Sequence, residues 1–69
     1  MKTIRELREA AGLTQVQLAF RLDVTPGSVY AWESGRSEPR ASQLRAMARL
    51  FSISMDEIDF ELEELKSAA

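Results

Sequence analysis

A link of only three residues, Asp23-Val24-Thr25, separates two short segments whose apolar residues recur at helical spacing. The segments cover residues 15–22 and 26–34. Two helices joined this closely must cross at a steep angle, as in a helix-turn-helix unit. Ala19 supplies a small side chain where the two helices approach each other, and Asp23 tolerates a left-handed turn better than most residues other than glycine. This link constrains the fold more than any other feature of the sequence.

Helix-start and helix-stop signals recur along the rest of the chain. The capping-box pattern, Ser or Thr followed three residues later by Glu or Gln, begins at Thr3, Thr14 and Ser54. Pro26 suits the first position of a helix, because the N–H that proline lacks would have no partner there. Gly12 and Gly35 stand where helices should end. The signals predict helices at 3–11, 15–22, 26–34, 41–51 and 55–64, and no strand pattern is found.

Apolar residues at helical spacing within these segments define the expected core. Its members are Ile4, Leu7, Ala11, Leu18, Ala19, Leu22, Val29, Trp32, Leu44, Met47, Ala48 and Phe51. A chain of 69 residues buries only about 60% of its unfolded surface, so nearly every apolar side chain must serve one core. We therefore predict an all-α fold, a single compact domain of five helices.

Composition excludes several classes of function. Cysteine and histidine are both absent, which excludes disulfides, zinc sites of the usual ligand types and Cys/His nucleophile pairs. No glycine loop that could cradle a phosphate occurs, and Glu33 with Ser34 or Ser37 makes no nucleophile–base set, so we expect neither an enzyme nor a cofactor. The charged segment MKTIRELREA has no signal-peptide core, and no run of about 18 apolar residues is present. We expect a cytoplasmic protein with no membrane partner.

Charge is distributed unevenly along the chain. The formal net charge is −2, which by itself argues against a nucleic-acid partner. Residues 1–50, however, carry eight basic side chains against five acidic ones, whereas residues 51–69 carry one basic side chain against six acidic ones. Asymmetry of this kind is more informative than the sum, and it fits either a basic binding domain or a plain solvated acidic tail.

The stretch LTQVQLAFRLDVTPGSVYAWESGRSEP resembles the Cro/CI-type (XRE) helix-turn-helix DNA-binding regulators. The matching pieces are Leu13-Thr14-Gln15, Leu18-Ala19, Trp32-Glu33, Gly35-Arg36 and Pro39. The similarity continues through the fourth predicted helix and covers residues 3–58, so we assign residues 1–58 to this domain and residues 59–69 to an acidic extension. The resemblance implies a five-helix, lambda-repressor-like fold whose second and third helices form the motif. The sequence departs from the family at Asp23, where a glycine is usual, and at Arg40, where Ser or Asp commonly caps the fourth helix.

The resemblance also implies that the segment 26–34 enters the major groove of double-stranded DNA. When Val29 and Trp32 face the core, the outward positions carry few groups that could read a base. The expected groove contacts are Thr25, Pro26, Gly27, Ser28, Tyr30 and Ala31. Gly27 either brings the helix backbone close to DNA or is simply tolerated in a first turn, and both interpretations stay open.

Phosphate contacts supply most of the affinity expected for such a protein. The residues expected to make them are Gln15, Ser34, Arg36 and Arg40. Gln15 lies at a helix start, where free N–H groups favour an anion. Arg45 and Arg49 lie four apart on an outer face and are expected to be solvated or salt-bridged rather than bound to DNA. Arg8 and Glu33 match a pair that joins the first and third helices in relatives, so we expect a partly buried structural ion pair.

The acidic end carries an apolar stripe at Met55, Ile58, Leu62 and Leu65, with Phe60 on the opposite side of the predicted helix. Like charges at Glu57 and Glu61 weaken that helix in isolation, so it needs a partner surface or frays after Ile58. These five apolar residues are the candidates for a dimer contact. We expect a homodimeric transcriptional regulator, a repressor, on a near-palindromic operator. The alternative is a protein-interaction module, antitoxin-like or adaptor, whose acidic helix binds a partner protein.

Overall fold

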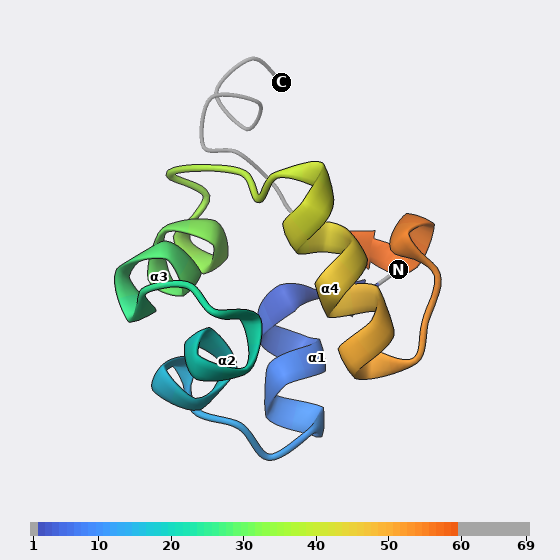
Figure 1. Ribbon diagram of the computed structural model, residues 1–69, viewed down its shortest axis with the longest axis horizontal. Helices are drawn as coiled ribbons and strands as arrows, with labels where there is room; N and C mark the ends of the chain where they lie inside the picture. Colours follow the sequence, from blue (N-terminus) through green and yellow to red (C-terminus); the bar gives the residue numbers. More distant parts are fainter. Residues whose placement is uncertain (1, 60–69) are drawn as a thin grey trace.

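A computed structural model of the protein describes residues 2–59, which form four α-helices, one 3₁₀ turn and a small parallel sheet (Figure 1). The elements are β1 (Lys2–Thr3), α1 (Ile4–Ala10), α2 (Gln15–Leu22), α3 (Pro26–Ser34), α4 (Ala41–Phe51), η1 (Met55–Glu57) and β2 (Ile58–Asp59). The observed bounds of α2, α3 and α4 are the predicted ones, and α1 begins one residue late and ends one residue early. Local capping signals therefore placed these helices well.

Side-chain caps start the first three helices. Thr3 and Glu6 form a reciprocal capping box, in which the Glu6 N–H donates to Thr3 Oγ1 over 3.1 Å and the Thr3 N–H donates to Glu6 Oε1 over 3.0 Å. Thr14 and Gln17 repeat the arrangement at α2. At α3, Thr25 accepts a hydrogen bond from the backbone N–H of Ser28, with proline at the first helical position. Each cap satisfies a donor that the helix itself leaves free.

The ends of α2, α3 and α4 share one geometry. The residues that follow α2, α3 and α4 adopt the left-handed conformation, with φ of 57° at Asp23, 79° at Gly35 and 55° at Ser52. The next backbone N–H in each case reaches back to a carbonyl five residues earlier, as when Val24 donates to Ala19 over 3.0 Å. This Schellman-type closure turns the chain sharply without leaving the last carbonyls unpaired. At Asp23 it produces the predicted tight turn between α2 and α3.

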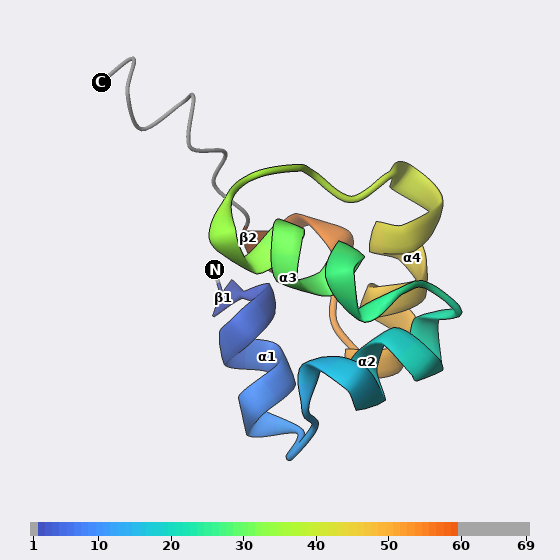
Figure 2. The same cartoon turned by 90° about the vertical axis from the view of Figure 1, so that its left-hand side faces the viewer.

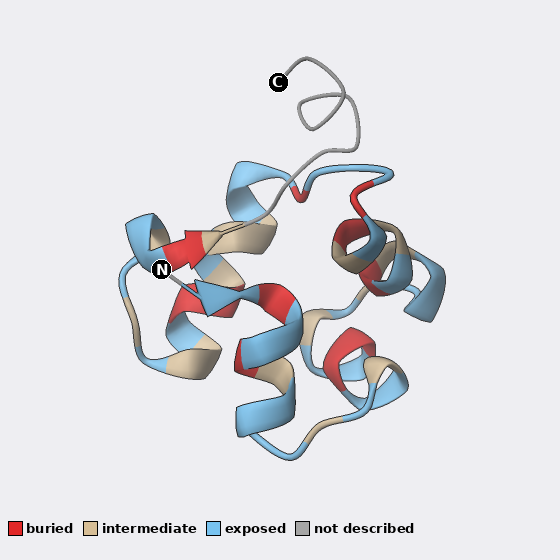
Figure 3. Ribbon diagram, turned by 180° about the vertical axis from the view of Figure 1, so that it is seen from behind, coloured by how far each residue is buried: buried red, intermediate tan, exposed pale blue. Residues whose placement is uncertain are grey.

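The core lies where the four helices face one another (Figure 3). The buried apolar residues are Ile4, Leu7, Leu18, Ala19, Val29, Trp32, Met47, Ala48 and Ile58. Figure 2 shows α3 running crosswise to α1, with α2 beneath it, and α3 packs on both of these helices while α2 also packs on α4. Gly35 and Pro39, in the loop after α3, are buried as well. The loop is therefore part of the packed domain.

The prediction of a fifth helix at 55–64 is wrong over its described part, and so is the prediction of a fold without strands. A single 3₁₀ turn covers Met55–Glu57, and the chain then extends so that Ile58 pairs with Lys2 and Asp59 with Thr3 in a parallel register. Ile58 is only 4% exposed, and its extended backbone is paired with β1 at the same time. Burial of this β-branched side chain outweighs the local helix signal. The remainder of the predicted helix lies outside the described residues.

Candidate nucleic-acid interface

The second motif helix, α3, presents a small and mostly exposed outer face. Thr25, Pro26 and Gly27 are exposed at its N-terminal end, and Tyr30 is 53% exposed one turn later. Ser28 and Ala31 are half-buried between these positions and the core. All six residues expected to meet the major groove thus lie on or beside one accessible face. Val29 and Trp32, on the opposite side, hold the helix against the core.

The hydroxyl groups of Thr25 and Ser28 on this face are bonded to each other. Thr25 Oγ1 lies 3.0 Å from Ser28 Oγ, and Thr25 also accepts the backbone N–H of Ser28 over 3.1 Å. The bonds fix both side chains at the start of α3 and leave little freedom to adapt to different bases. Tyr30 is the one long side chain on this face, and Gly27 has no side-chain atoms. Such a face offers few hydrogen-bonding groups for direct reading of bases.

Gly27 is not required by the fold. Its φ is not positive, and a Cβ built there would meet only Thr25 Oγ1, at an ordinary 3.8 Å. Gly35 and Gly12 differ, because both adopt positive φ angles that favour glycine. A glycine in the first turn of α3 lowers helix stability, and neither the backbone conformation nor a neighbouring atom requires it there.

Beyond α3, exposed basic side chains lie on the loop that leads to α4. Arg36 and Arg40 are both exposed. Within residues 2–59, the only ion pairs involve Arg5 and Arg8, both with Glu33, so Arg36 and Arg40 have no carboxylate partner in this part of the chain. Arg40 precedes α4 without supplying a side-chain cap, and its backbone N–H donates to Gln43 Oε1 over 2.7 Å. Both guanidinium groups are therefore available to an anion. Arg45 and Arg49 are also exposed, and within residues 2–59 neither of them has a carboxylate partner.

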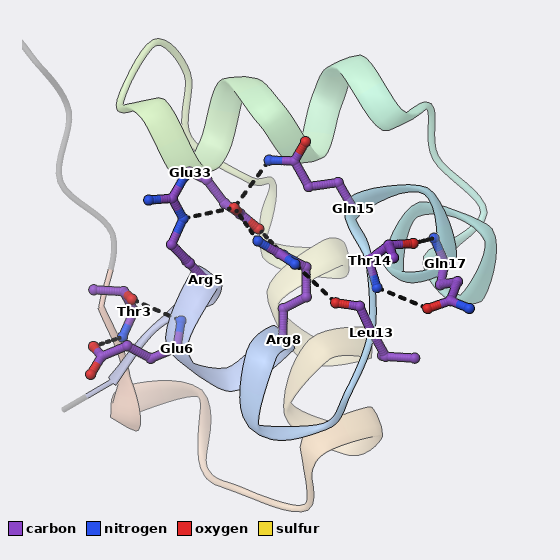
Figure 4. A network of polar contacts seen from close by, with 9 residues as sticks. All are labelled: Thr3, Arg5, Glu6, Arg8, Leu13, Thr14, Gln15, Gln17 and Glu33. Atoms are coloured by element: carbon purple, nitrogen blue, oxygen red, sulfur yellow. Dashed lines mark hydrogen bonds and ion pairs between the residues drawn. The ribbon is translucent and has the colours of Figure 1, made fainter.

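Arg8 and Glu33 lie in direct contact and join α1 to α3 (Figure 4). Arg8 Nε donates to Glu33 Oε2 over 2.7 Å, and Arg8 Nη2 donates to Glu33 Oε1 over 3.1 Å. The Arg8 side chain is 11% exposed and that of Glu33 only 1%. Arg8 Nη1 also donates to the carbonyl oxygen of Leu13 over 2.9 Å, which ties in the loop before α2. The pair thus connects α1, α3 and the loop before α2.

The electrostatics of this pair favour the ionised form of both partners. Burial alone would raise the pKa of Glu33, but hydrogen bonds from Arg8 and Gln15 and the positive charges of Arg8 and Arg5 outweigh it and hold the pKa below its ordinary value. The hydrogen bond to Glu33 raises the pKa of Arg8, against the smaller opposing effect of desolvation. A buried carboxylate held in this way is structural in character.

Gln15 lies at the first position of α2, where a phosphate contact was expected, but its amide already has a partner. Gln15 Nε2 donates to Glu33 Oε1 over 3.1 Å. An amide nitrogen carries two N–H groups, so a second donor remains for a phosphate. Ser34, the other expected phosphate contact on α3, is exposed, and its Oγ donates to the carbonyl oxygen of Ala31 over 3.3 Å. The network around Glu33 therefore lies beside two of the expected phosphate contacts.

Two surface features were missed by the sequence reasoning. Arg5 joins the Glu33 network, with its Nε 3.5 Å from Glu33 Oε1. The spacing of Arg5 and Arg8, three residues apart on one helix face, was the signal that could have found it. On α2, Val16 and Phe20 are 62% and 84% exposed, and they line a shallow cavity with Leu13, Gln17 and Arg21.

The dimer candidates divide into two groups. Ile58 is buried in the core of its own chain, and Met55 packs against that core, so within residues 2–59 both are engaged inside one protomer. Phe60, Leu62 and Leu65 lie outside the described residues. Over the described range no helix has the length and apolar character needed to cross a membrane.

Two short helices joined by a tight left-handed turn form a helix-turn-helix, whose second helix is exposed beside arginines that have no ion-pair partner within residues 2–59. The sequence profile of the family described as Helix-turn-helix, HTH_3, matches residues 4–58, and the chain belongs to this family of Cro/CI-type transcriptional regulators, which is not a family of enzymes. The chain is similar to the HTH-type transcriptional activator BcrR of Enterococcus faecalis, with 36% identity over 55 residues. That match covers 80% of this chain and 27% of the length of BcrR. The comparison with solved structures finds no match.

Proposed function

We propose that this chain binds double-stranded DNA as a transcriptional regulator, with α3 in the major groove and phosphate contacts on both sides of it. The observation that supports this most directly is the exposed outer face of α3 beside Arg36 and Arg40, which have no ion-pair partner within residues 2–59. Gln15 and Ser34 add polar groups beside Glu33, at the last turn of α3. Basic and polar groups that flank a groove-reading helix fix its register on the duplex.

The composition of this face predicts modest selectivity between DNA sequences. Ala31 offers one methyl group, which can meet a thymine methyl, and Ser28 discriminates weakly between bases. Tyr30 supplies the one long contact. Binding energy therefore comes mainly from phosphates, and the affinity should fall steeply as salt rises.

A salt titration tests the contact surface. Binding of labelled duplexes is measured by fluorescence anisotropy between about 50 and 200 mM salt, the range over which phosphate contacts change affinity most visibly. Arg36→Ala should weaken binding to all duplexes alike and reduce the salt slope by about one. Arg49→Ala, on the outer face of α4, is the matched control and should change neither quantity. If Arg36→Ala behaves like the control, the proposed contact surface is incorrect.

The regulator is further proposed to act as a homodimer on a near-palindromic operator. Two copies of α3 about 34 Å apart would then meet successive major grooves. Selection from random duplexes should return inverted half-sites about 10 base pairs apart, centre to centre. Half-sites recovered singly would instead indicate a monomer. The dimer contact itself is assigned to the acidic end, so a chain ending at Asp59, which keeps β2 intact, should bind one half-site only.

The direction of regulation is the remaining part of the proposal. A domain that covers a promoter excludes other proteins from it, and repression is the outcome we propose for this chain. BcrR is named as an activator, which makes activation the competing outcome. A reporter placed behind the selected operator separates the two, because repression lowers expression when the protein is supplied and activation raises it.

A further inference from the structure

The Glu33 carboxylate is approached by more positive charge than its own negative charge balances. Its two oxygen atoms already receive two hydrogen bonds from Arg8, at 2.7 and 3.1 Å, and one from Gln15 at 3.1 Å. Arg5 approaches the same carboxylate as a second cation, with Nε 3.5 Å from Oε1. Among these three side chains, one carboxylate faces two guanidinium groups, so one positive charge is left over at the junction of α1, α2 and α3.

The two arginines differ in what they do for the fold. The Arg8 side chain is 11% exposed and bonds Glu33 through two nitrogen atoms, whereas the Arg5 side chain is 63% exposed and approaches Glu33 at a longer distance. Exposed ion pairs contribute little to stability, and this one adds to a carboxylate that Arg8 has already neutralised. Packing and stability therefore do not account for Arg5.

The position of Arg5 points to an anion. Figure 4 shows Arg5 and Gln15 reaching Glu33 from opposite sides, and both approach the same oxygen, Oε1. Ser34 directly follows Glu33 in α3 and is exposed. The Arg5 guanidinium thus lies across Glu33 Oε1 from the Gln15 amide, on the α1 side. With Nε turned towards Glu33, the other guanidinium nitrogens remain available as donors in a rigid fork, which suits phosphate oxygens.

We propose that Arg5 is a phosphate-binding residue, and that its guanidinium binds a backbone phosphate of the DNA beside Gln15. This inference rests on the proposed DNA binding and adds a contact from α1, outside the helix-turn-helix. Glu33 acts as a positioning residue in it, because one oxygen of its buried carboxylate, Oε1, is approached by both the guanidinium of Arg5 and the amide of Gln15. The negative charge of the phosphate then balances the positive charge of Arg5, because Arg8 already neutralises Glu33.

The test compares three variants of the full chain on one fixed duplex. Arg5→Gln removes the charge, Arg5→Lys keeps it, and Arg49→Gln removes an exposed arginine from α4 as the matched control. Arg5→Gln should weaken binding by on the order of tenfold and lower the salt slope by about 0.9, the value for one phosphate contact. Arg5→Lys should recover most of the slope, and Arg49→Gln should match the wild type.

Thermal melting of each variant distinguishes binding from folding. Since Arg8 continues to neutralise Glu33, Arg5→Gln should melt within a few degrees of the wild type. An unchanged salt slope for Arg5→Gln, or unfolding of this variant at the assay temperature, would overturn the inference while the wild type still binds DNA. If the wild type shows no salt-dependent binding at all, the proposed function itself is wrong.

Discussion

Arg8 and Glu33 lie 25 residues apart in the chain, yet two hydrogen bonds, of 2.7 and 3.1 Å, join their side chains. The pair connects α1 to the last turn of α3, the helix whose outer face is exposed. Through Arg8 it also holds the carbonyl oxygen of Leu13, just before α2. The orientation of α3 therefore depends on a contact that is remote from the residues proposed to read the groove.

Removal of one partner from this pair should cost more stability than removal of both. Arg8→Ala leaves the Glu33 carboxylate buried with only Gln15 and the exposed Arg5 as partners, and we expect a loss of about 3 kcal/mol, as for other broken buried pairs. The double variant Arg8→Met/Glu33→Leu should recover a large part of that loss, because no unpaired charge remains. Urea denaturation of the single and double variants measures both values. A double variant less stable than either single one would contradict this account.

Acid should remove part of the stability that Glu33 supplies. Because the folded-state pKa of Glu33 lies below its ordinary value of 4.5, the folded form binds its proton less readily than the unfolded chain does. The contribution is fully present above about pH 4.5 and is lost as the pH falls through the lower folded-state value. Melting temperatures between pH 7 and pH 3 should therefore converge for the wild type and Glu33→Gln. Parallel curves over this range would show that another group causes the acid sensitivity.

Local signals placed most of the helices correctly for a physical reason. A cap involves residues no more than a few positions apart, so Thr14 with Gln17 and Thr25 with Pro26 can be recognised without knowledge of the fold. The pairing of Ile58 with Lys2 has no such local signal, since strands of two residues show no alternation and their partners lie at opposite ends of the domain. For the same reason the fifth helix was predicted where β2 is found.

The candidate site could be predicted from the sequence only in part, unlike the helices. The exposed face of α3 follows from helical periodicity once Val29 and Trp32 are assigned to the core. The contact between Arg8 and Glu33 came from the resemblance to a known family, because nothing local to either residue indicates its partner. The part played by Arg5 depends on the side-chain geometry around Glu33, which spacing alone does not supply. Polar networks that join several helices are thus the least accessible part of such a site.

Replacement of the left-handed residues that end α2 and α4 by glycine should stabilise the domain. Asp23 and Ser52 adopt φ angles of 57° and 55°, which glycine adopts without a steric cost. Asp23→Gly and Ser52→Gly should each stabilise the domain by up to about 1 kcal/mol, whereas Asp23→Val should destabilise it, because a β-branched side chain is strained at this backbone geometry. Thermal melts of the three variants measure the differences. If Asp23→Val is as stable as the wild type, the turn is not held in the conformation described.

Substitution of Gly27 should change stability and DNA binding in opposite directions. A Cβ at this position meets only Thr25 Oγ1, at 3.8 Å, and alanine favours a helix by up to about 1 kcal/mol over glycine, so Gly27→Ala should raise the melting temperature. The same substitution should weaken DNA binding, because the added methyl group holds the start of α3 away from the groove. Ser42→Ala, at the second position of α4, is the matched control, with no expected effect on binding. Anisotropy and melting on the same samples measure both changes. A more stable Gly27→Ala variant with undiminished affinity would show that the glycine is merely tolerated in the first turn and that the helix backbone does not approach the bases there.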